Sequence, residues 1–315
     1  MRKIVSLFLV FLLIASASAA CAEKREAPAD KKVITTQDVN SYETSFRQYD
    51  SKFYDAPSQE PGTVTELTYT TGIYGEPIEN TVKVYLPFGY GENKTERYDI
   101  LYFYHGTNET QDSFIGDERA KNALDNMIET GVARPFIMVL PTYYYDYANR
   151  AFDLELFQQE MRHDIMPAVE SAYRTYAETA DDAGFADSRD HRGFAGYSNG
   201  CRMCWYSFCY LLDTGRWFLP MSNSIGVPTI FNGIEAQSDY RGQYFVFPCC
   251  GGPRDDLSTA TTNLVNELIK RPDCFSYGLD REAGNNLYLY KSTGLHQTLT
   301  ARFFLYNAFK DGLFR

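Results

Sequence analysis

Apolar and polar residues alternate at two places early in the chain, and apolar residues run on without interruption at two others. The alternating stretches, residues 64–74 and 81–86, are rich in β-branched and aromatic residues, which favours hairpin strands. The uninterrupted runs, residues 100–104 and 136–140, have the length of strands buried on both faces. The pattern therefore predicts a sheet whose inner strands are covered on two sides.

Helical spacing of apolar residues follows each of the two buried runs. Residues 117–130 carry apolar side chains three or four positions apart, and Gly131 ends the pattern. A second helical pattern covers residues 154–176, and Pro167 within it predicts a kink or the start of a new helix. Strand and helix therefore alternate along this part of the chain.

The alternation continues to the C-terminus. A strand is expected over residues 192–195, and three short strands are expected over residues 218–221, 244–247 and 287–290. Helices are expected over residues 199–212, 258–270 and 298–311. Eight strands alternating with helices predict an α/β fold, with a mostly parallel eight-stranded sheet and helices on both faces. We expect one domain over residues 59–315.

The first 58 residues lack this alternation. Residues 1–20 combine a basic start, a short apolar run and a small-residue region, which predicts a secretory signal peptide. Cys21 follows small residues, so lipid modification at a cell surface and free secretion both stay open. Residues 21–58 are polar and charged with little periodicity and are predicted to be a tether.

The net charge of the chain argues against some classes of binding partner. The chain has 30 basic and 41 acidic residues; without Arg2 and Lys3, 28 basic residues remain, a net charge of −13. Nucleic acid is held mainly through Lys and Arg on its phosphates, so this composition argues against it. An extracytoplasmic enzyme with a neutral or polymeric substrate fits the balance better.

Six cysteines lie beyond Cys21, an even number that permits disulfides in an exported protein without fixing their pairing. Cys201 and Cys204 have the spacing of half a zinc site or a redox pair. They lack a second ligand pair at metal spacing and fall inside a predicted helix, so buried packing is the favoured interpretation. No metal or organic cofactor is expected.

The motif Gly196-Tyr197-Ser198-Asn199-Gly200 fits G-x-S-x-G, in which a serine nucleophile sits on a sharp turn between strand and helix. A serine hydroxyl needs a base within hydrogen-bonding reach and an acid that orients the base. In this fold the chain order is serine, acid, histidine. His296 is the histidine beyond Ser198, in a loop between the last predicted strand and the last helix.

The acid is expected in the Gly-rich loop that follows residues 244–247. Asp255 is the first choice, and the adjacent Asp256 is the alternative that the residues alone leave open. An oxyanion hole needs backbone N–H donors, expected from Asn199 after the nucleophile and from Thr107 after residues 100–104. The aromatic loop that begins at residue 143 predicts substrate contacts from three tyrosines, namely Tyr143, Tyr144 and Tyr145.

Several stretches together resemble carbohydrate esterase family 1, and within it the feruloyl esterase domains attached to bacterial xylanases and the esterase D-like hydrolases. They are residues 104–109, 136–142, 157–173, 191–200, 244–255 and 294–296. The resemblance covers about residues 60–312 in the family's order. It implies an α/β-hydrolase fold and a triad of Ser198, Asp255 and His296.

The expected activity is hydrolysis of a carboxylic ester through an acyl-enzyme. The resemblance implies feruloyl or acetyl esters on plant polysaccharide such as xylan as the substrate. An acyltransferase with the same triad is one alternative. A non-catalytic glycan-binding lipoprotein is another, because Thr107, Asn199 and Cys201 depart from the family's usual residues.

Overall fold

The computed structural model describes residue 39 and residues 51–143 and 153–315, all within one compact unit, Ile34–Arg315. The predicted signal peptide, Cys21 and most of the predicted tether lie outside the described residues. Among the residues described, no helix is both long enough and apolar enough to cross a bilayer.

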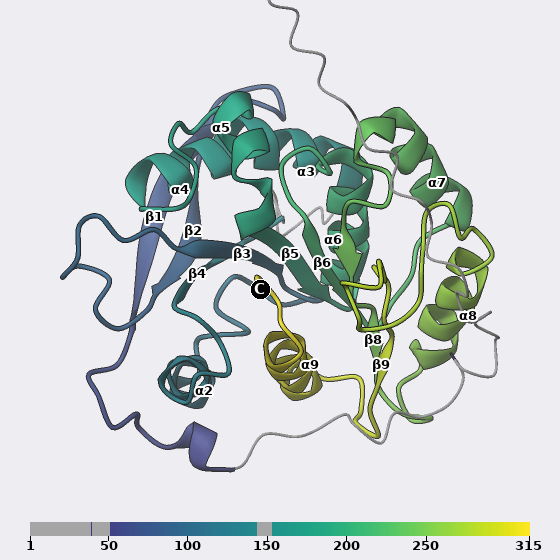
Figure 1. Cartoon of the computed structure of the whole chain (residues 1–315). Coiled ribbons are helices and arrows are strands. Elements are labelled where there is room, and N and C mark those ends of the chain that lie inside the picture. The colour runs from purple at the N-terminus through teal and green to yellow at the C-terminus, as the bar shows by residue number, and fades with distance from the viewer. Residues whose placement is uncertain (1–38, 40–50, 144–152) are drawn as a thin grey trace, which may run out of the picture. The chain divides into compact units, whose positions relative to one another are not determined.

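One mixed sheet organises the described residues (Figure 1). Its path is β1-β2-β4-β3-β5-β6-β8-β9, and β7 pairs with β6. The strands from β4 onward along this path are parallel, whereas β1 and β2 form an antiparallel hairpin beside β4. The bounds are β1 Thr63–Thr71, β2 Ile78–Leu86, β3 Asp99–Tyr104, β4 Phe136–Pro141, β5 Arg192–Tyr197, β6 Trp217–Met221, β7 Phe245–Val246, β8 Cys249–Cys250 and β9 Tyr290–Lys291.

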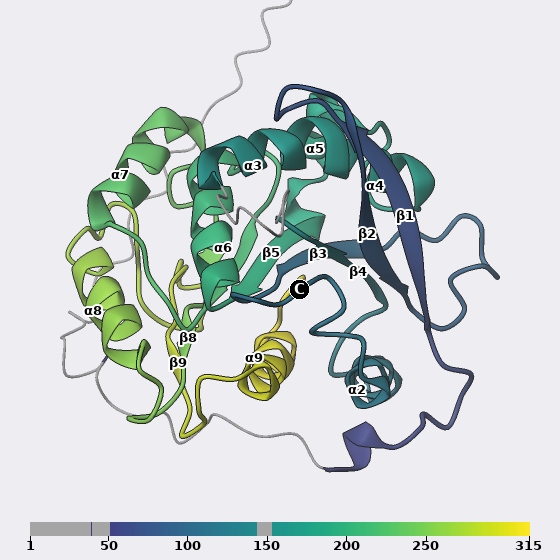
Figure 2. The same ribbon diagram turned by 180° about the vertical axis from the view of Figure 1, so that it is seen from behind.

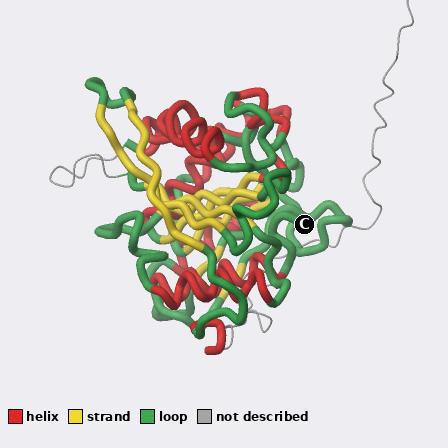
Figure 3. Tube along the Cα trace, turned by 90° about the vertical axis from the view of Figure 1, so that its left-hand side faces the viewer, coloured by secondary structure: helices red, strands yellow, loops and turns green. Residues whose placement is uncertain are grey.

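Helices cover both faces of this sheet, as predicted, and the side view separates the two layers (Figure 3). One layer holds α2 (Glu118–Glu129) and α9 (Thr298–Lys310). The other holds the remaining helices: α3 Leu154–Glu160, α4 Met166–Ala172, α5 Asp182–Asp187, α6 Asn199–Tyr210, α7 Val227–Ala236 and α8 Ser258–Leu268. Along β3, Leu101 and Phe103 face the first layer while Tyr102 faces the second. Because β3 is an inner strand and is buried on both faces, its sequence is an uninterrupted apolar run.

The structure corrects three expectations about the strands and helices. The described sheet has nine strands rather than eight, because β8 forms in the Gly-rich loop that was expected after residues 244–247. Pro248, which lacks a backbone N–H, lies between β7 and β8. The helix expected over residues 154–176 is three segments, since a π-helical turn (Met161–Ile165) precedes Pro167 and α4 ends at Ala172. The helices α5 and α7 were not predicted.

The start of the folded domain is also earlier than residue 59. A 3-10 turn, η1 (Ser51–Tyr54), packs against α2. The side chain of Asn122 donates a 3.0 Å hydrogen bond to the carbonyl of Tyr54, and the backbone N–H of Ser58 donates to the carboxylate of Glu129. The last residues of the predicted tether are therefore part of the domain.

A buried ion pair fastens β5 to α4. The guanidinium of Arg192 donates hydrogen bonds of 2.7 and 2.6 Å to the two carboxylate oxygens of Glu170. Tyr102 of β3 also donates to this carboxylate. Both charged side chains are almost fully shielded from water, so the pair fixes the base of the strand that carries Ser198 at its other end.

Candidate active site

Ser198 lies in the turn between β5 and α6. Its backbone has φ 60° and ψ −116°, a strained conformation for a residue with a side chain. Its N–H bonds the carbonyl of Met221 on β6, and its own carbonyl accepts from the N–H of Cys201, one turn into α6. The turn is thus held by the sheet on one side and the helix on the other.

The two glycines of the motif are required by close backbone contacts. A Cβ at Gly196 would lie 2.1 Å from the carbonyl oxygen of Gly200. A Cβ at Gly200 would lie 2.1 Å from the carbonyl oxygen of Tyr104, at the end of β3. Only glycine allows α6 to begin this close to β3, and this closeness brings Ser198 beside the loop that follows β3.

His296 lies between Ser198 and Asp255. Its Nε2 is 3.0 Å from the hydroxyl oxygen of Ser198, and its Nδ1 is 2.9 Å from Oδ1 of Asp255. The ring also packs at a tilt against Tyr197. A hydroxyl, an imidazole and a carboxylate in hydrogen-bonded series can move a proton from the hydroxyl and stabilise the resulting imidazolium.

Asp255 and Asp256 occupy different environments. The side chain of Asp255 is buried, whereas that of Asp256 is 83% exposed and lies 3.8 Å from Nδ1 of His296. Asp255 accepts hydrogen bonds from the hydroxyl of Ser222 (2.8 Å) and the backbone N–H of Gly251 (2.7 Å) and of Leu257 (3.1 Å). Burial alone would raise the pKa of Asp255, but these bonds and the one from His296 outweigh it, so its pKa is below the ordinary value.

Asp255, Asp256 and His296 also form a group, among the described residues, whose side chains are close enough together to bind a metal ion. One ligand atom each from Asp255, Asp256 and His296 lies within 4.8 Å of the others. In this arrangement His296 already contacts both Asp255 and Ser198 through its two ring nitrogens. The expectation that no metal is needed stays a prediction.

The loop after β3 passes beside Ser198. A Cβ at Gly106 would lie 3.4 Å from the Cβ of Ser198. The N–H of Gly106 is engaged by the carboxylate of Glu109 at 2.6 Å, and Thr107 follows on an exposed part of the loop. Asn199 is the first residue of α6, where backbone N–H groups have no partner within the helix. The oxyanion roles of Thr107 and Asn199 stay predictions.

Tyr143 does not lie where a substrate contact was expected. Only 2% of it is exposed; its ring stacks on His105 with the ring centroids 4.4 Å apart, and its hydroxyl donates a 2.6 Å hydrogen bond to the carbonyl of His105. The imidazole of His105 also contacts the carbonyl of Gly106, and burial lowers the pKa of His105. Tyr143 therefore supports the loop after β3 from the core. Tyr144 and Tyr145 lie outside the described residues.

Comparison with known proteins gives relatives in sequence and in structure. No family model matches the chain. Endo-1,4-β-xylanase Y of Acetivibrio thermocellus is 33% identical over 264 residues, which are 81% of this chain and 23% of the xylanase. The chain thus spans less than a quarter of that relative's length. An endo-1,4-β-xylanase/feruloyl esterase of Xylanibacter ruminicola is 30% identical over 124 residues, 37% of this chain and 17% of that protein.

Solved structures share the fold over most of both chains. The feruloyl esterase module of Clostridium thermocellum, a serine-to-alanine mutant complexed with sinapinate, matches with a TM-score of 0.76 and 29% identity. The match covers 86% of this chain and 95% of the module. The chain is thus similar to feruloyl esterases of carbohydrate esterase family 1 in sequence and in structure. Its fold is the α/β-hydrolase fold. A family 1 ferulic acid esterase of the fungus Anaeromyces mucronatus has the same fold at 19% identity, with a TM-score of 0.63 over 87% of this chain and 98% of that one.

Two residues to which the sequence analysis assigned no role support this site. Glu109 accepts the N–H of Gly106 with one carboxylate oxygen and the hydroxyl of Thr298 with the other, at 2.8 Å. It thereby joins the loop after β3 to the start of α9, two residues past His296. Ser222, with φ 56°, holds Asp255 from the end of β6. Glu109 is near Gly106 in the sequence, but only the fold brings it to Thr298 and brings Ser222 to Asp255.

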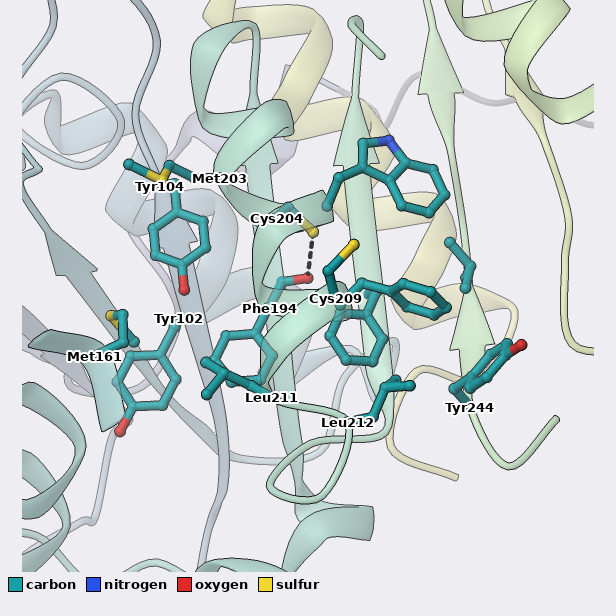
Figure 4. Packing of buried hydrophobic residues seen from close by; sticks show 14 of the residues in the cluster. Tyr102, Tyr104, Met161, Phe194, Met203, Cys204, Cys209, Leu211, Leu212 and Tyr244 are labelled. Carbon is teal, nitrogen blue, oxygen red and sulfur yellow. Dashed lines mark hydrogen bonds between the residues drawn. The ribbon is translucent and has the colours of Figure 1, made fainter. Parts of the chain in front are cut away.

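The six described cysteines are free and buried, as the packing interpretation predicted for Cys201 and Cys204. The thiol of Cys204 donates to the carbonyl of Phe194 on β5, in a cluster with Cys209, Tyr104 and Tyr244 (Figure 4). Burial raises the pKa of Cys201 and Cys204 well above the usual value. These thiols pack α6 against the sheet. The remaining histidines lie apart from the site: His163 is exposed, and His191 pairs with Asp99 at 2.7 Å.

Proposed function

We propose that the chain is a serine carboxylic-ester hydrolase that removes feruloyl or acetyl groups from xylan through an acyl-enzyme. The observation that carries the proposal is the series from Ser198 through His296 to Asp255, with separations of 3.0 and 2.9 Å. The similarity to feruloyl esterases supports the reaction class. The polysaccharide substrate is suggested by the xylanase and feruloyl esterase relatives.

In the proposed reaction Ser198 attacks the ester carbonyl carbon while His296 Nε2 takes the hydroxyl proton. The tetrahedral intermediate collapses, and the imidazolium returns the proton to the leaving sugar hydroxyl. Water then attacks the acyl-enzyme with His296 as the base, which releases the acid and restores Ser198. Asp255 keeps Nδ1 protonated and stabilises the imidazolium, while the backbone N–H groups of Thr107 and Asn199 receive the oxyanion.

The environment of Asp255 suits this role. A carboxylate that orients an imidazolium must stay ionised at working pH, and the lowered pKa of Asp255 favours that state. The hydrogen bonds from Ser222, Gly251 and Leu257 also leave it little freedom to rotate. Asp256 lacks this burial and lies farther from Nδ1, so we assign the acid to Asp255.

Hydrolysis of methyl ferulate and p-nitrophenyl acetate tests the proposal. We expect Ser198→Ala to reduce kcat/KM by about 10³-fold or more. The matched control is Ser171→Ala, which removes an exposed serine hydroxyl on α4 that bonds the carbonyl of Pro167. Equal rates for the wild type and Ser198→Ala would refute the esterase mechanism and favour a binding protein. Activity that is unchanged by EDTA is expected, because no step uses a metal.

We propose also that the chain is exported by residues 1–20 and then either secreted or held at the cell surface by lipid on Cys21. The basic, apolar and small-residue order of the N-terminus supports export. Mass spectrometry of the N-terminal peptide of the mature chain decides between the two fates. A diacylglycerol mass on Cys21 that is lost in Cys21→Ala supports the anchor, and an unmodified peptide supports free secretion. An intact Met1 peptide would refute export.

A further inference from the structure

A groove opens along α6 at the end farther from Ser198. It has a volume of about 440 Å³. Its walls come from α3, α6 and α7. α6 lies between the other two helices and packs against both (Figures 1 and 2). Its lining is Glu155, Cys209, Tyr210, Thr229, Asn232, Gly233, Ala236 and Gln237.

Small residues on α7 make the groove possible. A Cβ at Gly233 would lie 2.6 Å from the Cα of Cys209, so α7 approaches α6 to backbone contact at this point. Ala236, one turn further along α7, adds only a methyl group to the wall. The side chain of Gln237 closes one end, since it bonds both the N–H of Leu212 and the carbonyl of Cys209. The groove is therefore built into the packing of the helices.

Two tyrosines give α6 an aromatic outer surface beside this groove. Tyr206 and Tyr210 are one helical turn apart, and their rings are nearly parallel, at 11°, with centroids 6.1 Å apart. Tyr210 is 36% exposed and Tyr206 is half-buried. Such large, partly exposed ring faces at a concave surface are typical of binding sites.

Polar groups stand around the rings. The carboxylate of Glu155 on α3 lies against the hydroxyl of Tyr210, and burial together with this carboxylate raises the pKa of Tyr210 to about 12. Thr229 and Asn232 supply a hydroxyl and an amide from α7. Flat aromatic faces bordered by carboxylate, amide and hydroxyl groups match the C–H face and the ring of hydroxyls of a pyranose sugar. A polyanion would meet the Glu155 carboxylate and a net charge of −11.

We propose that this groove, with Tyr206 and Tyr210, is a second binding site for the neutral backbone of a polysaccharide. Taking that polymer to be arabinoxylan rests on the function proposed above. Tyr210 is twelve positions beyond Ser198, or roughly 18 Å along the helix axis. A sugar in the groove does not reach the nucleophile, but several linked sugars span the distance. The groove then holds the polymer near Ser198 and raises the local concentration of its ester groups.

Binding is tested first in a Ser198→Ala background, which removes turnover. Affinity electrophoresis in soluble arabinoxylan measures the dissociation constant. We expect Tyr206→Ala/Tyr210→Ala to weaken binding about tenfold or more, since two ring faces are lost. Tyr206→Phe/Tyr210→Phe keeps the faces and should stay within about threefold of the parent. The matched control is Tyr176→Ala, which removes a 40% exposed tyrosine that stacks on His191.

Three outcomes of this experiment overturn the proposal. They are the absence of arabinoxylan binding by the parent, equal affinity for the parent and the double alanine variant, and equal binding of polygalacturonate. Circular dichroism and the melting temperature of each variant establish that it is folded. The phenylalanine variant separates the ring faces from the hydroxyls, because it keeps the rings and removes only the O–H groups.

A kinetic comparison separates this proposal from the esterase proposal. With Ser198 intact, the double alanine variant should raise KM for feruloylated arabinoxylan about tenfold and leave kcat/KM for methyl ferulate within about twofold. An equal loss on both substrates would overturn the groove as a polymer site. If the wild type does not hydrolyse methyl ferulate, the esterase proposal fails, while the binding measurement still decides the groove.

Discussion

Glu109 gives the sharpest test of how this site is held together. One carboxylate oxygen accepts the backbone N–H of Gly106 at 2.6 Å, and the other accepts the hydroxyl of Thr298 at 2.8 Å. The first bond fixes the residue before Thr107, a proposed oxyanion donor. The second fixes the start of α9, close to His296. Glu109→Ala should therefore disturb two parts of the site without removing any group that reacts.

The magnitude follows from the bonds that are lost. Hydrogen bonds to a charged group contribute about 1.5–3 kcal/mol each. Glu109→Ala should therefore remove a restraint of about this size from Gly106 and another from Thr298. Removal of a whole oxyanion donor costs about 10²–10³-fold in kcat, which sets the upper limit. A donor that is displaced rather than removed should cost less. We expect Glu109→Ala to lower kcat about 10- to 100-fold with KM within about twofold.

Glu109→Gln should recover most of this loss. The amide carbonyl can still accept the N–H of Gly106, and the amide N–H can donate to the hydroxyl oxygen of Thr298. Both bonds survive as neutral ones, which are weaker by roughly 1 kcal/mol than charged ones. The matched control is Glu129→Ala, because Glu129 accepts the N–H and hydroxyl of Ser58 in the same manner on α2.

Steady-state hydrolysis of p-nitrophenyl acetate at pH 7 supplies the measurement. A kcat for Glu109→Ala within twofold of the wild type would refute the positioning role. A kcat that rises would refute it too, since the carboxylate charge would then oppose the oxyanion more than the loop restraint helps it. A loss of equal size in Glu129→Ala would show that the effect is one of general stability.

Three further predictions concern the turn, the acid and the ion pair. Gly200→Ala should abolish esterase activity and lower the melting temperature, because its Cβ would lie 2.1 Å from the carbonyl of Tyr104. Since the pKa of Asp255 is lower in the folded state, its charge stabilises the fold above about pH 4, and this contribution disappears as pH falls through the lowered pKa. Urea midpoints of the wild type and Asp255→Asn should therefore converge from pH 5 to pH 3. Glu170→Gln leaves the buried charge of Arg192 uncompensated and should cost about 3–5 kcal/mol of unfolding free energy in urea titrations; a double apolar replacement should cost less.

The inner strands were predictable because their burial leaves a continuous apolar run in the sequence. β3, β4 and β6 were predicted to within one or two residues for this reason. β7 falls within the strand expected over residues 244–247, whereas β8 was expected to be loop, since a two-residue strand leaves no periodicity. α7 was missed because Gly226 and Pro228 at its start and Gly233 within it are residues typical of turns.

Some residues of the candidate site could be predicted from the sequence and others could not. Ser198 and His296 were found from a motif and from chain order, which are local signals. The contacts of Glu109 with Thr298 and of Ser222 with Asp255 carry no such signal, because only the folded chain brings these partners together. Tyr143 shows the opposite error: an aromatic run suggested a binding surface, but the first tyrosine of the run packs beneath the loop after β3.

The choice between Asp255 and Asp256 depends on a glycine. A Cβ at Gly251 would lie 2.6 Å from the Cβ of Asp255 and 2.6 Å from the carbonyl oxygen of Gly294, two residues before His296. Because Gly251 has no side chain, the loop that carries Asp255 can fold over the Asp255 carboxylate. The same loop packs directly on the loop that carries His296, where the N–H of Gly252 donates to the carbonyl of Gly294. The side chain of Asp256 is not buried by this contact and stays 83% exposed. A Gly-rich loop thus favours an acid at this position because close backbone approach buries one carboxylate and leaves its neighbour hydrated.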